Sequence, residues 1–150
     1  MRKIFLCFAL IMVSAFPAMG EIQHYGPLTA DIPSGWTVEQ QGSVTVIKSL
    51  SNNASIAVAV NSLGDAKLTD IAEHLYIQMS GKNLEQDEDG DYTFTFTNTS
   101  GAEGLAILTD SGEGRYILMS VTGYGTTKYG NDEALNDEID KIIDSLDWND

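Results

Sequence analysis

Residues 92–97 (YTFTFT) alternate aromatic and threonine side chains without interruption. This strict period of two predicts a β-strand that buries its aromatic face and turns its threonine face outward. Two further apolar stretches, 103–109 and 115–122, follow after short segments of turn-forming residues. Strands joined by short turns pair as an antiparallel meander, so an antiparallel sheet is the framework that the rest of the chain must fit.

The N-terminal part of the chain predicts additional strands. Pro33 removes a backbone donor and ends one of them, and a Ser-Gly pair then forms a turn before Trp36, which we expect to be buried at one end of the core. A later strand places small residues, Ala57 and Ala59 among them, on one face, which suggests that a helix packs closely there. Residues 21–26 give no strand pattern and predict a start that is untethered or only lightly pinned. The predicted strands cover residues 28–32, 36–39, 44–49 and 54–61.

Two helices complete the expected fold. Apolar residues recur at helical spacing over residues 69–79, where Thr69 or Asp65 is the expected N-cap and a Ser-Gly pair the expected stop. The same spacing returns over residues 132–146, with Asn131 as the expected cap. The sequence therefore predicts an α+β fold in which an antiparallel sheet of about six to seven strands is flanked by two helices.

A targeting segment precedes this domain. A basic pair at positions 2 and 3 is followed by an apolar run over residues 4–13 and by small residues that end at Gly20. This order is typical of a secretory signal peptide, so we expect residues 1–20 to be cleaved after Gly20 and the protein to be periplasmic or secreted. Residues 21–150 are then a single domain. The chain's one cysteine, Cys7, lies in the signal, so the mature fold must be stable without disulfides.

The charge balance narrows the range of partners. The chain has 8 basic and 22 acidic residues. Two of the basic residues lie in the signal, so the mature chain carries a formal charge of −16. A protein needs a basic face to bind nucleic acid or an anionic membrane surface. Neither is therefore an expected partner of this acidic chain. A basic protein, a cation and a well-solvated surface remain compatible with this acidity.

An acidic run over residues 85–91 is the sharpest local signal for a ligand. Carboxylates on alternate residues before a glycine provide the hard oxygen ligands that calcium prefers. Asp87, Asp89 and Asp91 are the candidate metal ligands, and calcium is the one cofactor considered. However, Phe96 occupies the position where a calcium loop needs a bidentate glutamate, and a strand follows where a helix should. The alternative is a solvated turn that keeps the next strand from aggregating.

The sequence contains no recognisable catalytic constellation. It has no Gly-x-Ser-x-Gly elbow, and the mature part has no cysteine nucleophile. His24 and His74 are isolated, which disfavours a metal hydrolase. A glycine-rich loop over residues 123–130 lacks the Gly-Lys-Ser/Thr ending of a phosphate-binding loop. These patterns favour a non-catalytic protein, and a small hydrolytic enzyme that uses a carboxylate pair is the second alternative.

Three aromatic residues are difficult to place in a core. Tyr124 and Tyr129 lie in the glycine-rich loop, and Trp148 lies almost at the end of the chain. Aromatic side chains beside a glycine-rich loop are candidates for a protein-contact surface. The alternative is a loop that folds back on its own rings.

The order of these elements resembles the PsbP-like family. The resemblance is carried by residues 30–36 (ADIPSGW), the early helix over 69–79, the meander, and residues 137–146 (DEIDKIIDSL). It covers most of the mature chain and implies an α/β/α sandwich that acts mainly by contacting other proteins. No functional residue of that family can be matched here. The sequence thus predicts an exported accessory domain that binds proteins, with cation binding through residues 85–91 as the alternative.

Overall fold

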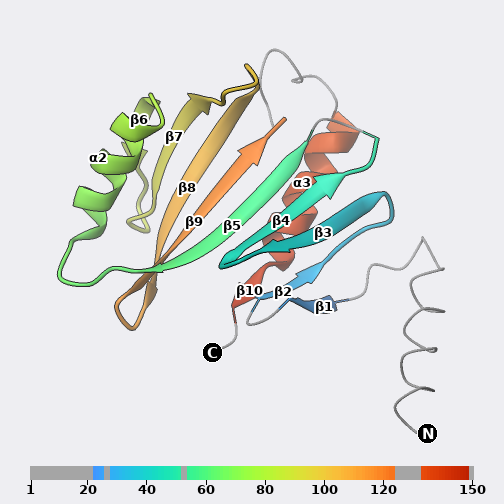
Figure 1. Ribbon diagram of the computed structural model, residues 1–150, viewed down its shortest axis with the longest axis horizontal. Helices are drawn as coiled ribbons and strands as arrows, with labels where there is room; N and C mark the ends of the chain where they lie inside the picture. The colour runs from blue at the N-terminus through green and yellow to red at the C-terminus, as the bar shows by residue number, and fades with distance from the viewer. Residues whose placement is uncertain (1–21, 26–27, 52–53, 124–132, 149–150) are drawn as a thin grey trace, which may run out of the picture.

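The protein forms a large antiparallel sheet with a helix on each side. The computed structural model describes residues 22–25, 28–51, 54–123 and 133–148 (Figure 1). Seven strands lie in the order β3-β4-β5-β9-β8-β7-β6, and a three-stranded sheet has the order β1-β2-β10. The bounds are β1 Ile22–Tyr25, β2 Leu28–Asp31, β3 Trp36–Gln41, β4 Val44–Ser49, β5 Ser55–Ser62, α2 Leu68–Gln78, β6 Lys82–Gln86, β7 Tyr92–Thr97, β8 Glu103–Gly112, β9 Arg115–Thr122, α3 Glu133–Ser145 and β10 Asp147–Trp148.

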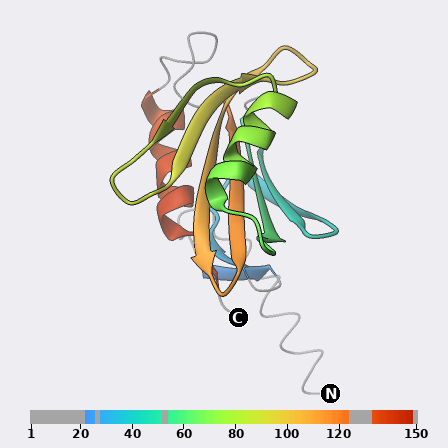
Figure 2. The ribbon, with the colours of Figure 1, turned by 90° about the vertical axis from the view of Figure 1, so that its left-hand side faces the viewer.

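The predicted α+β class and meander are confirmed. Strands β7, β8 and β9 are consecutive antiparallel neighbours in the sheet. Helices α2 and α3 contribute to two separate hydrophobic clusters, and they lie on opposite sides of the large sheet (Figure 2). Alternate residues of β9 divide between these clusters, because Leu118 joins the α2 cluster while Ile117 and Met119 join the α3 cluster.

The α3 cluster contains the tryptophan that the sequence predicts to be buried. Trp36 begins β3 and is 7 % exposed, which confirms that prediction. Its ring packs among apolar residues of β4, β5 and α3, including the fully buried Ile47 and Ile139. The indole Nε1 donates a hydrogen bond to Oε2 of Glu138, at 2.8 Å. The polar atom of a buried indole is therefore satisfied by α3 itself.

The α2 cluster is built on the aromatic face of β7. Phe94 is 1 % exposed, and its ring meets that of Tyr76 edge to face, with centroids 5.7 Å apart. Helix α2 ends where Ser80 adopts a left-handed backbone with φ of 52°. A Cβ on the following Gly81 would lie 2.6 Å from the Tyr76 ring and 2.8 Å from the Phe94 ring. Gly81 is thus required for close packing, while Ser80 makes the turn.

The predicted cap of α2 is wrong. Neither Thr69 nor Asp65 occupies the N-cap position, which is taken by Lys67, and Lys67 makes no side-chain capping bond. Thr69 lies within the first turn, and its hydroxyl is hydrogen-bonded to that of Tyr92 at 2.7 Å. The Thr69 hydroxyl, which the sequence pattern assigned to the helix cap, thus makes a tertiary hydrogen bond instead. The predicted α3 cap, Asn131, lies outside the described residues.

Besides the two-residue strand β10, two short strands were not predicted. Residues 22–25 form β1, which pairs with β2, so the start of the domain is not untethered. Residues 82–86 form the edge strand β6, whose pairing with β7 shifts register between Lys82 and Glu85. The acidic run therefore begins inside a strand. Both strands expose most of their described side chains and depend on a neighbour for pairing, so neither has an alternating pattern of its own.

No helix of the described chain packs on the small residues of β5. Pairing places Ala57 opposite Val46 and Ala59 opposite Val44, so these side chains share one face of the sheet. That face is opposite the one that carries Ile47 and Ile56, which α3 covers. Neither hydrophobic cluster includes the four residues, and each is only half-buried. The expected helix contact is therefore not made within the described part of the chain.

Candidate binding sites

A pocket of about 350 Å³ lies at one end of the large sheet. It forms where the β3–β4 turn, the end of β5 and the start of β9 meet, and β1 contributes the aromatic ring of Tyr25. Register explains why the lining converges: Gln40 pairs with Thr45, and Ser62 pairs with Arg115. These residues and Val60 occupy alternate positions on the face of the sheet that carries the α3 cluster.

The polar groups of the pocket are held by short contacts. The Gln40 amide donates to Oγ1 of Thr45 at 2.9 Å, and Thr45 is only 5 % exposed. The Tyr25 hydroxyl donates to Oε1 of Gln23 at 2.6 Å. Burial raises the pKa of Tyr25 above its ordinary value near 10, so the phenol stays neutral at physiological pH. The pocket thus presents a neutral aromatic side chain beside an ordered amide.

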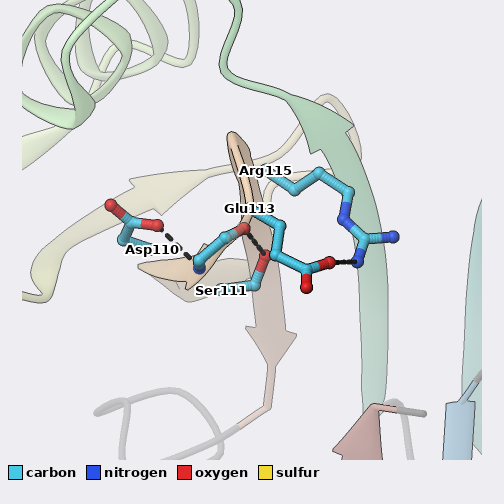
Figure 3. Close-up of polar contacts among 5 residues, drawn as sticks. Asp110, Ser111, Glu113 and Arg115 are labelled. Carbon is cyan, nitrogen blue, oxygen red and sulfur yellow. Dashed lines mark hydrogen bonds and ion pairs between the residues drawn. The ribbon is translucent and has the colours of Figure 1, made fainter. Parts of the chain in front are cut away.

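Arg115 is positioned by the β8–β9 turn (Figure 3). Oδ1 of Asp110 accepts a hydrogen bond from the backbone N–H of Gly112 at 2.8 Å, and Glu113 has a left-handed backbone with φ of 55°. This turn places Oε2 of Glu113 3.2 Å from Nη2 of Arg115. Both side chains are partly solvent-exposed, so the ion pair orients the guanidinium more than it stabilises the fold.

The pocket lining is suited to binding rather than to proton transfer. Its residues include serine, threonine, glutamine, asparagine, tyrosine and arginine, but no aspartate, glutamate, histidine or cysteine. Ser62 accepts a hydrogen bond from the backbone N–H of Gly64 at 3.3 Å and has no base beside it in the lining. Nucleophilic or acid–base catalysis would require such a partner. The lining can instead hydrogen-bond a polar molecule.

A second candidate surface is the sheet face that carries the small residues. We call it the open face and define it by Glu39, Val44, Val46, Ala57 and Ala59, which strand pairing places together. Lys48 Nζ lies 2.9 Å from Oε2 of Glu39 at its margin, and this contact lowers the pKa of Glu39. The centre of the face is therefore apolar and free of net charge.

The acidic run forms the β6–β7 hairpin turn. Oδ1 of Asp87 accepts backbone hydrogen bonds from Asp89 at 3.0 Å and from Asp91 at 2.9 Å. Burial, followed by the charges of Asp87 and Asp89, raises the pKa of Asp91, while a hydrogen bond from Thr109 opposes the shift. No group of three or more His, Cys, Asp or Glu side chains suited to a metal occurs within the described ranges. Calcium binding here stays a prediction.

Replacing Asp87 by alanine should destabilise the protein by about 1 kcal/mol, because the turn loses the oxygen that accepts two backbone hydrogen bonds. Asp87→Asn keeps a carbonyl oxygen in that place and should cost less. Urea unfolding measures both. Equal losses in the two variants would show that the charge, and not the acceptor, matters at this position.

The other predicted site residues are not brought together in the described structure. Tyr124 and Tyr129 lie outside the described residues. The backbone of Trp148 pairs with Leu28 in the small sheet, and the Trp148 side chain is not among the described parts of the structure. His24 and His74 are both exposed, in β1 and α2 respectively. Sequence reasoning missed the pocket, for which the local signal was the basic Arg115 at the start of a predicted strand.

The sequence matches no known family model, and no curated protein matches it. Within the described ranges, no helix is long and apolar enough to span a membrane. The pocket and the open face are therefore the two features of the described chain that bear on its function.

Proposed function

We propose that this protein is an exported, non-catalytic accessory domain with a PsbP-like α/β/α architecture, which binds an amphipathic helix of a basic partner protein on its open face. Support for export comes from residues 1–20, whose pattern is that of a signal peptide. Support for a binding role comes from the large sheet, on which no described helix packs against the open face. The single observation that carries the proposal is the apolar open face, which no described element covers.

The side chains of the open face suit a helix. The apolar face of a sheet gains stability when another layer covers it, and helices are the usual second layer in α+β folds. Ala57 and Ala59 form a low floor, and Val44 and Val46 add β-branched apolar surface beside it. A helix with a stripe of larger apolar residues can approach this floor closely. Recognition of a helix by an apolar surface is a recurrent mode of protein binding.

Charge selects the kind of helix. The chain has a formal charge of −14, so a partner that carries positive charge is attracted over a long range. Glu39 lies at the margin of the open face, where a basic residue flanking the apolar stripe could reach it. A basic amphipathic helix therefore matches both the apolar centre of the face and the negative charge of the whole chain.

Site-specific photo-crosslinking tests this proposal in the intact exported protein. A photoreactive residue at Val46 should give a discrete adduct, and mass spectrometry should place the crosslink in a basic, amphipathic helical segment of the partner. Ala57→Asp, which puts a charge on the floor, should lower the yield about tenfold. High salt should also lower it, because the attraction is electrostatic at long range.

The matched control carries the photoreactive residue at Thr95, which is exposed on β7 and lies on the opposite side of the sheet. Equal adducts at both positions, or an adduct that survives Ala57→Asp in a folded variant, would contradict the proposal. N-terminal sequencing of the exported protein should give Glu21 as its first residue, which checks the cleavage site separately.

A further inference from the structure

We infer that the pocket between Tyr25 and Arg115 is a binding site for a small, uncharged, hydroxyl-rich molecule, of which a single carbohydrate ring is the chemical type. This inference uses the pocket and not the open face. The two proposals can therefore fail separately.

The dimensions and lining suit a compact ligand. A volume of about 350 Å³ is at the lower end of the range for small-molecule pockets, so one ring fits better than an extended chain. Tyr25 offers an apolar ring against which the C–H face of a sugar can pack. Thr45 and Val60 provide a buried and a half-buried surface on the sheet. The pocket thus has an apolar side and a polar side, as a sugar ring does.

The hydrogen-bonding groups favour hydroxyls over charged groups. The amide of Gln40 and the hydroxyls of Ser43 and Ser62 each contain both a donor and an acceptor. A ligand hydroxyl also both donates and accepts, so it can pair with any of them. A carboxylate ligand would use only donors, and an ammonium ligand would use only acceptors.

The charges of the pocket lining and of the whole chain also favour an uncharged ligand. Arg115 is the one charged residue in the lining, and Glu113 already lies 3.2 Å from its guanidinium. The formal charge of −14 on the whole chain opposes the approach of an anion. A cation would enter a lining that contains no carboxylate. An uncharged ligand avoids both penalties, and Arg115 can serve it as an oriented donor group.

Three sugars with the same ring and different charges test the inference: methyl β-D-glucopyranoside, D-glucuronate and D-glucosamine. Each is titrated into the ¹⁵N-labelled mature protein while amide signals are followed by NMR. The neutral sugar should shift the signals of Thr45, Val60 and Asn61 saturably, and it should bind more tightly than either charged ring. Tighter binding of D-glucuronate or D-glucosamine would overturn the uncharged class. The absence of shifts at about 50 mM neutral sugar, which corresponds to less than about 2 kcal/mol of binding, would overturn the site.

Neighbouring glutamines give a matched pair of variants. Gln40 lines the pocket, whereas Gln41 is the next residue of β3 and lies on the opposite face. Gln40→Leu should weaken sugar binding about fivefold, the worth of one hydrogen bond, and Gln41→Leu should change it by less than about twofold. Equal effects of the two substitutions would overturn the assignment. Tyr25→Leu should also weaken binding, and the glutamine pair decides the question if that variant does not fold.

Discussion

Trp36→Ala should lower the free energy of unfolding by about 3–5 kcal/mol, the usual cost of removing a buried aromatic side chain. The indole is 7 % exposed and is part of the cluster that joins β3, β4, β5 and α3. Its loss leaves a cavity, and it also removes the Nε1 donor that reaches Glu138 at 2.8 Å. Urea unfolding of the mature protein measures the change.

Two further variants separate packing from hydrogen bonding at this position. Trp36→Phe keeps most of the apolar contact but loses the donor to Glu138, so it should cost less than the alanine variant. Glu138→Gln keeps an acceptor oxygen and should change stability by about 0.5 kcal/mol or less. An unchanged unfolding midpoint for Trp36→Ala would mean that the indole is exposed in solution.

Phe94→Ala should have a comparable effect on the other side of the sheet, again about 3–5 kcal/mol. The ring is 1 % exposed, it packs against Tyr76 at a centroid distance of 5.7 Å, and Gly81 approaches it closely. Removing it takes away the surface on which α2 ends. Thermal unfolding followed by circular dichroism should show a lower melting temperature.

The matched control for Phe94 is Thr97→Ala in the same strand. Thr97 is exposed on the other face of β7, so this change should alter stability by about 0.5 kcal/mol or less. Similar losses in Phe94→Ala and Thr97→Ala would contradict the assignment of the aromatic face to the core. The comparison therefore tests the face that the alternating pattern predicted.

Elements with a strong local pattern could be predicted from the sequence. Strand β7 has the predicted bounds because aromatic and threonine side chains alternate along it, and β9 divides its residues between two faces as expected. Strands β1 and β6 were missed because their side chains are largely exposed and their existence depends on pairing with β2 and β7. Pairing between strands is a tertiary property, which a single-sequence pattern does not record.

The candidate sites were harder to predict than the fold. The pocket joins Tyr25 and Arg115 to residues from two other segments, 40–45 and 60–62, so no short motif contains it. Asp87 was predicted to be a metal ligand, but its Oδ1 accepts two backbone hydrogen bonds within its own turn. Carboxylates favour both uses, and the sequence alone does not distinguish an aspartate that binds an ion from one that closes a turn.

The division of the core into two clusters has a consequence for how the molecule opens. The clusters share no residue, and the sheet lies between them. Separation of α2 from β7 and β8 would expose Phe94 while Trp36 remained buried. If α2 opens separately in this way, the two halves of the domain have different free energies of opening. Amide exchange in α2 and the fluorescence of Trp36 need not then report the same value. A single unfolding midpoint would then describe only the more stable half of the domain.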